Sequence, residues 1–179
     1  MSEFLDDNFN HIRNLANDID TRLSGVSTGE QRLRNELAGM FAVTIAATYE
    51  GIVKETLISY AAKVHPKYLD YIEKDLKQTN ARISVDDLRA YSIRFGLTEW
   101  SGLGAKKDST TFHRVLNERK LTVERRFRAD LIVSYTNLFR WRNAYAHQRT
   151  TTATIKDVYE AHRIAQYVIR SFVKAFELG

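Results

Sequence analysis

Apolar residues recur every three or four positions along most of the chain, which is the spacing of amphipathic helices. In the first segment, residues 3–24, the positions expected to face inward are Ile12, Leu15, Ile19 and Leu23. Gly25 lies just past this segment, where helices commonly stop. No stretch indicates a β-sheet of any size, so the pattern predicts an all-α fold.

The second predicted helix is the longest. It begins at Ser27 or Thr28, each followed three positions later by Glu or Gln in a capping-box pattern, and runs to Val64, before Pro66. About 35 residues at 1.5 Å each would span roughly 50 Å, so we expect other helices to pack around it. Its middle, 38–47, is rich in small residues, which would let a neighbouring helix approach closely.

Residues 67–107 resemble an insertion or lid between the long helix and the C-terminal part of the chain. Apolar spacing predicts a short helix over 67–78, and Ser84 with Asp87 forms a capping pattern that predicts another. A glycine-containing loop is expected over 100–109.

A helix is predicted over residues 122–147, and two apolar stripes run along it. One stripe is expected to face the core: Leu138, Trp141 and Tyr145. The second follows a different line: Tyr135, Phe139, Arg142 and Ala146. Two stripes require two packing partners, so we expect the second stripe to meet the same helix of a second subunit in a homodimer. The alternative is a helix that is fully internal to one subunit.

The last predicted helix starts at Thr154, with Asp157 three places on in a capping pattern. Its inward stripe is continuous: Val158, His162, Ala165, Ile169, Phe172 and Phe176. His162 is therefore either a hydrogen-bonded core residue or a supporting catalytic histidine. Together these elements predict an up-and-down helical bundle with a long second helix and a C-terminal helix, in a single domain over 1–179.

Composition narrows the classes of protein that fit. An apolar content of 44% excludes a disordered chain, and the net charge of +5 favours a polyanionic partner. No apolar run approaches about 18 residues, so no membrane span is expected. The absence of cysteine excludes disulfides and thiolate metal sites and fits a cytoplasmic protein. The histidines lack metal-ligand spacing, so we assign no metal and no cofactor.

The candidate chemistry lies at the end of the 122–147 helix. At about 100° per residue, Arg142 and His147 are about 140° apart around the helix, and Asn143 and Ala146 lie between them. Arginine can hold a phosphate through two hydrogen bonds, and histidine can accept or donate a proton near neutrality. An RNA strand supplies its own nucleophile, the 2′-OH beside the scissile phosphate. The group therefore suits metal-free cleavage of RNA.

The sequence Arg142-Asn143-x-x-Ala146-His147, followed by a loop and a final amphipathic helix, resembles the signature of the HEPN superfamily. These are small helical domains, many of them metal-independent endoribonucleases in prokaryotic defence and toxin–antitoxin systems. The resemblance implies an active site formed across a homodimer, with catalytic Arg142, Asn143 and His147. Toxins of the nucleotidyltransferase-paired branch carry a Tyr two places after the His, where Arg149 stands here.

The stretch 33–55, with Ala46-Ala47-Thr48-Tyr49-Glu50, resembles the long second helix of the MAE/RiboL-PSP-like HEPN nuclease branch. This resemblance makes Glu50 a supporting acidic group near the histidine; a solvated or salt-bridged carboxylate is the alternative.

A dense basic run precedes the motif helix: Arg119, Lys120, Arg125, Arg126 and Arg128. It is either a track for RNA phosphates or a charged face balanced by Glu118 and Glu124. The leading hypothesis is an endoribonuclease that leaves 2′,3′-cyclic phosphate and 5′-OH ends, with RNA and a homodimer mate as partners. A cognate antitoxin or regulatory protein is a further expected partner. The alternative is a non-catalytic module that dimerises or binds RNA or a nucleotide.

Overall fold

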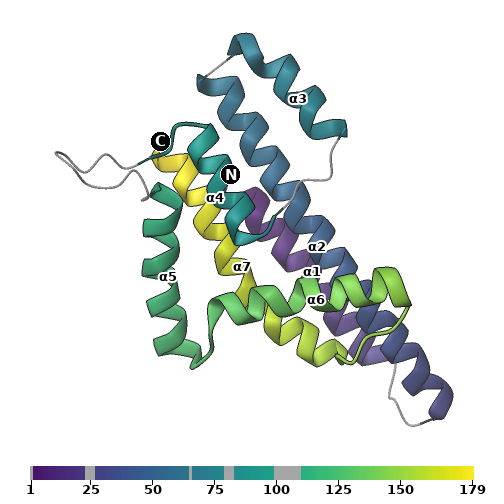
Figure 1. The fold of residues 1–179 in the computed structure, drawn as a ribbon. Helices are drawn as coiled ribbons and strands as arrows, with labels where there is room; N and C mark the ends of the chain where they lie inside the picture. The colour runs from purple at the N-terminus through teal and green to yellow at the C-terminus, as the bar shows by residue number, and fades with distance from the viewer. Residues whose placement is uncertain (1, 23–26, 65, 79–82, 99–109) are drawn as a thin grey trace. The chain divides into compact units, whose positions relative to one another are not determined.

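The computed structural model describes residues 2–22, 27–64, 66–78, 83–98 and 110–179, and the loop expected over 100–109 lies outside them. Within these ranges the protein is all-α, and Thr98 and Thr110 form an isolated antiparallel bridge. This confirms the predicted helical bundle with a long second helix and a helix after the motif. The helices in chain order (Figure 1) are α1 (Ser2–Arg22), α2 (Thr28–Val64), a 3-10 turn (Pro66–Tyr68), α3 (Leu69–Gln78), α4 (Val85–Arg94), α5 (Thr111–Phe127), α6 (Leu131–Gln148) and α7 (Ile155–Leu178).

The chain folds into two compact units. The first comprises Met1–Thr48 and Phe127–Gln166, and the second comprises Tyr49–Arg126 and Tyr167–Gly179. Helices α2 and α7 therefore each contribute to both units. The interpretation of 1–179 as one domain, and of 67–107 as an insertion or lid within it, stays a prediction.

Helix α1 buries a different face from the one predicted. Its buried residues are Leu5, Phe9, Ile12 and Ala16, at spacings of four and three residues. Leu15 and Ile19 are only partly buried, and Leu23 lies outside the described residues. The two candidate rows share Ile12, and their mean directions around the helix differ by roughly 45° at 100° per residue. The row that begins at Leu5 is the more deeply buried one, and it includes the aromatic ring of Phe9.

Helix α2 begins as predicted. The Ser27 backbone N–H donates to Glu30 Oε2 at 3.1 Å, and the Glu30 N–H donates to Ser27 Oγ at 3.2 Å. Its 37 residues span roughly 55 Å. Among the described helices, α2 alone is long and apolar enough to cross a membrane, with a window of mean hydropathy 1.3. Half of that window is buried inside the protein. Core helices can meet the same criteria of length and hydropathy, so these two properties are weak evidence for a membrane span.

The second unit has an aromatic core. Tyr60, Phe95 and Phe176 contact one another edge to face, with ring centroids 5.1–5.9 Å apart. This edge-to-face arrangement of the three rings is electrostatically favourable, in addition to burying apolar area.

The predicted capping box at Ser84 and Asp87 is present at the start of α4.

The predicted helix over 122–147 is wrong in one respect: it is the end of α5 and the whole of α6, separated by a break. Arg128 has φ of 51°, and Asp130 caps α6 by accepting hydrogen bonds from the backbone N–H groups of Ile132 and Val133 at 2.7 and 3.0 Å. A short aspartate side chain that satisfies free N–H groups favours a new helix start over continuation. The apolar spacing on either side hides this break.

Candidate active site at the end of α6

Helix α6 ends directly after the Arg142-to-His147 motif. Arg149 adopts the left-handed conformation, with φ of 54°, and its N–H donates to the Tyr145 carbonyl at 2.9 Å. The run of three threonines at 150–152 follows, and β-branched residues are poor at continuing a helix. The motif therefore occupies the last turns of a helix, beside an exposed chain reversal.

Tyr145 anchors this end of α6 to α2 within the first unit. Its ring is buried, and its hydroxyl donates to Glu36 Oε2 at 3.2 Å. A Cβ at Gly39 would overlap the Tyr145 ring. The glycine is what lets the ring lie against the backbone of α2, which confirms the expected close approach at the small-residue stretch.

The stripes predicted along α6 are present in part. Leu138 and Tyr145 are buried as expected, whereas Trp141 is only partly buried. On the second stripe Tyr135 is buried and its ring lies 4.9 Å from that of Phe139, which remains partly exposed. Ala146, at the end of the second stripe, is exposed. An apolar line on α6 is thus left incompletely covered within one chain.

The motif side chains reach solvent. His147 and Asn143 are exposed, and Arg142 is partly buried. Arg142 Nη1 donates to Asn143 Oδ1 at 3.0 Å. Asn143 precedes His147 by four residues and so lies on nearly the same face of the helix. The amide therefore links the guanidinium, on one side of α6, to the face that carries the imidazole.

The two predicted supporting residues are Glu50 and His162. Glu50 is partly buried on the part of α2 that belongs to the second unit, whereas the motif belongs to the first. His162 is 2% exposed, and its ring lies 5.6 Å from that of Phe9. This burial favours the core interpretation of His162 over a catalytic one.

The basic run divides between two elements. Arg119, Lys120, Arg125 and Arg126 are exposed on α5 in the second unit, and Arg128 lies in the break before α6. Arg125 Nε donates to the Leu121 carbonyl at 3.2 Å, and Glu118 pairs with Arg114 at 3.3 Å. These residues do not lead into the motif along one continuous helix, as the sequence had indicated.

The remaining histidines and acids among the described residues offer no metal site, and one histidine, His113, has a perturbed pKa. In the described part of the chain, no three His, Cys, Asp or Glu side chains gather closely enough to hold a metal ion. His113, in the second unit, has Nδ1 3.2 Å from Thr110 Oγ1. Burial, and then the positive charge of Arg89, lower the pKa of His113, while Asp86 opposes them.

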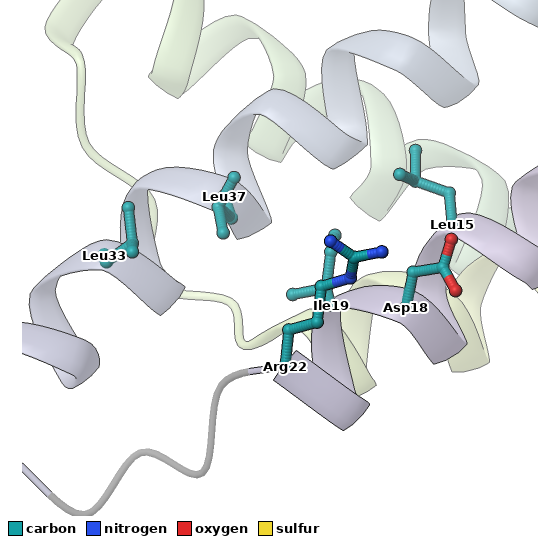
Figure 2. Close-up of a pocket in the computed structure, with 6 residues that line it drawn as sticks. All are labelled: Leu15, Asp18, Ile19, Arg22, Leu33 and Leu37. Atoms are coloured by element: carbon teal, nitrogen blue, oxygen red, sulfur yellow. The ribbon is translucent and has the colours of Figure 1, made fainter.

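An apolar groove of about 390 Å³ lies between α1 and the start of α2 in the first unit. Figure 2 shows its lining: Leu33 and Leu37 from α2, and Leu15, Asp18, Ile19 and Arg22 from α1. It exists because α1 turns a different row of residues inward and leaves Leu15 and Ile19 incompletely covered. It holds no histidine and no pair of acid–base groups suited to proton transfer.

Sequence reasoning overlooked Arg140. This exposed residue precedes Asn143 by three positions and His147 by seven. The i, i+3, i+7 spacing that identified the apolar stripes would have placed these three polar residues on one face.

Nearly the whole chain resembles one protein family. The family model described as RiboL-PSP-HEPN matches residues 4–178. No curated protein and no solved structure matches the chain.

Proposed function

The chain belongs to the RiboL-PSP-HEPN family, which matches it over residues 4–178, and from this premise we propose that it is a metal-independent endoribonuclease. HEPN domains are often ribonucleases, so the family supports this class of enzyme. The assignment of metal-independent cleavage depends on the side chains at the end of α6. The observation that carries it is an exposed His147 on the same helix face as Asn143, whose Oδ1 accepts a hydrogen bond from the Arg142 guanidinium at 3.0 Å.

In the proposed reaction the 2′-OH of RNA attacks the adjacent phosphorus. The O2′–P bond forms as the 2′-OH loses its proton, and the P–O5′ bond breaks as the leaving 5′ oxygen gains one. The products are a 2′,3′-cyclic phosphate and a 5′-OH. His147 acts as general base or general acid, and Arg142 stabilises the charge that accumulates on the phosphate oxygens. Asn143 positions the guanidinium through the hydrogen bond described above.

We assign the complete site to a homodimer. A second copy would supply a second imidazole, so that one histidine accepts a proton while the other donates one. The proposal is supported by Phe139 and Ala146, which remain partly or fully exposed on the second stripe of α6. A two-fold interface repeats the same patch on both subunits, so it would bring two motifs together.

The biological setting follows from the class of enzyme. A nuclease that needs only RNA and its own side chains must be restrained in the cell, which fits a cytoplasmic toxin or defence protein held inactive by a cognate protein. Arg149 stands where the nucleotidyltransferase-paired toxins carry a modified Tyr, so restraint by modification at this position is not part of the proposal.

The test is RNA cleavage in excess EDTA by purified protein. The wild type is expected to cut a labelled RNA and to leave cyclic phosphate and 5′-OH ends. His147→Ala should lower the rate roughly 10²- to 10⁴-fold, the range for a lost general acid or base. Arg142→Ala should lower it roughly 10²- to 10³-fold, as for a lost donor to a developing anion.

The matched control is His11→Ala, which removes an exposed histidine of α1 in the same unit. It should cleave at the wild-type rate. Circular dichroism must show that all variants remain helical. Cleavage that depends strictly on added metal would refute the mechanism.

The second candidate is a non-catalytic HEPN module that dimerises or binds RNA. It is favoured by one observation: Arg142 is partly buried and hydrogen-bonded to its own neighbour, as a structural arginine would be. In that case Arg142→Ala should lower the free energy of unfolding, whereas His147→Ala should change neither stability nor RNA binding.

A further inference from the structure

The segment that contains α6 carries no carboxylate. No Asp or Glu occurs between Asp130, the α6 cap, and Asp157, whereas Arg140, Arg142, Arg149 and Lys156 all fall within this stretch. Several arginines elsewhere in the described residues do pair with acids: Arg34 with Asp20, Arg94 with Asp75, Arg114 with Glu118 and Arg163 with Glu160.

Arg140 is the exposed cation on this segment that shares a face with His147. The two residues are seven positions apart, so they differ by about 20° around the helix and by about 10 Å along it. Arg142, by contrast, lies about 160° from Arg140 on the other side. Among the described residues, neither the Arg140 nor the His147 side chain forms a hydrogen bond or ion pair.

An unpaired guanidinium about 10 Å from the imidazole matches the backbone of a nucleic acid strand. Stacked strands carry one phosphate per roughly 3.4 Å, so this separation corresponds to about three nucleotide steps, and to fewer in an extended strand. Asn143 lies between the two residues on the same face and is also exposed. The face therefore offers a cation, an amide and an imidazole in a line along the helix.

We propose that Arg140 binds a backbone phosphate of the RNA one to three nucleotides from the cleaved bond, so that the strand lies along α6. The inference rests on the proposed function and deepens it, because it names a positioning residue and a minimum substrate length. A dinucleotide places its single phosphate at His147 and does not reach Arg140. A longer strand reaches both.

This length dependence gives the decisive test. Arg140→Gln should lower kcat/KM for a 10-nucleotide RNA about tenfold, mostly through KM, and should leave cleavage of a dinucleotide unchanged. Arg142→Ala should impair both substrates. Arg140→Lys, which keeps the charge, should restore most of the activity on the longer strand.

Binding supplies an independent readout. In a His147→Ala background, where cutting should be slower by roughly 10²- to 10⁴-fold, fluorescence anisotropy should show Arg140→Gln binding the 10-nucleotide RNA about tenfold more weakly. The slope of log affinity against log salt concentration should fall by about 0.7, the value for one phosphate contact to a single strand. Arg163→Gln is the matched control, since Arg163 is exposed in the same unit but paired with Glu160 at 2.9 Å. It should change neither affinity nor slope.

The outcomes separate the two proposals. Wild-type protein that cuts RNA while Arg140→Gln retains affinity, salt slope and activity on long strands would overturn this inference alone. An equal loss on dinucleotide and long RNA would also overturn it, because Arg140 would then act at the cleaved phosphate or on the fold. Wild-type protein that neither binds nor cuts RNA would overturn the proposed function, and this inference with it.

Discussion

At the scale of single residues, Gly39 sets how closely α2 and α6 approach. The Tyr145 ring occupies the space where any other residue at position 39 would place its Cβ. The same tyrosine donates its hydroxyl proton to Glu36 and precedes the candidate histidine by two positions. The placement of the motif thus depends on a residue with no side chain.

We expect Gly39→Ala to lower the free energy of unfolding by about 1–3 kcal/mol, the usual loss when a packed site is overfilled. Urea denaturation followed by circular dichroism measures this. The control is Gly51→Ala on the same helix, where a Cβ would meet nothing within 4 Å. That variant should be as stable as the wild type or more stable by up to about 1 kcal/mol. Equal behaviour of the two variants would contradict the packing of Tyr145 described here.

The residues of the candidate site were predictable from the sequence only in part. Arg142, Asn143 and His147 were identified as a group from their spacing, and their catalytic roles stay predictions. The hydrogen bond from Arg142 to Asn143 could not be foreseen, because it depends on side-chain rotamers that the sequence leaves open. Arg140 was missed because the chemistry was placed around the helix only from Arg142 to His147, and Arg140 precedes that stretch.

At the scale of helices, the capping residues decide where elements begin. The box at the start of α7 illustrates the chemistry: the Thr154 N–H and hydroxyl donate to Asp157 Oδ2 at 2.9 and 2.7 Å. These hydrogen bonds, the backbone one first, lower the pKa of Asp157 below its ordinary value of 3.8. The folded state therefore favours the ionised carboxylate, and the stabilisation is present above that ordinary value and lost as pH falls through the lowered pKa.

Asp157→Ala is therefore expected to lower the free energy of unfolding by about 0.3–1.5 kcal/mol at pH 7, the range for a capping interaction. The difference between variant and wild type should shrink as the pH falls below about 4. Denaturation midpoints measured from pH 7 to pH 3 test this. A difference that stays constant to pH 3 would show that the ionised carboxylate does not supply the stabilisation.

Helix starts were predictable where a box of two side chains marks them, as at Ser27, Ser84 and Thr154. The start of α6 was not, because Asp130 caps it alone and apolar spacing continues on both sides. The inward face of α1 was also misassigned. Two apolar rows overlap at Ile12, and only the residues packed against the helix decide which row is more deeply buried.

At the scale of the whole molecule, the second stripe of α6 predicts a dimer. Ala146→Arg would place a charge on the exposed end of that stripe without disturbing the core. We expect it to convert a dimer of the 20.7 kDa chain into a monomer, as measured by light scattering after gel filtration. Thr136→Arg, at an exposed position on another face of α6, should remain dimeric. A wild-type protein that is monomeric at micromolar concentration would contradict the proposed two-fold site.

The division of the chain between two compact units limits how the protein can be taken apart. The chain passes from one unit to the other between Thr48 and Tyr49, between Arg126 and Phe127, and between Gln166 and Tyr167. The first and last of these passages lie inside α2 and α7. A protease that cuts once cannot release either unit as an intact fragment, and neither half of the sequence expressed alone contains a complete core. Truncation is therefore a poor way to map activity in this protein, and point substitutions in the full chain are the appropriate tool.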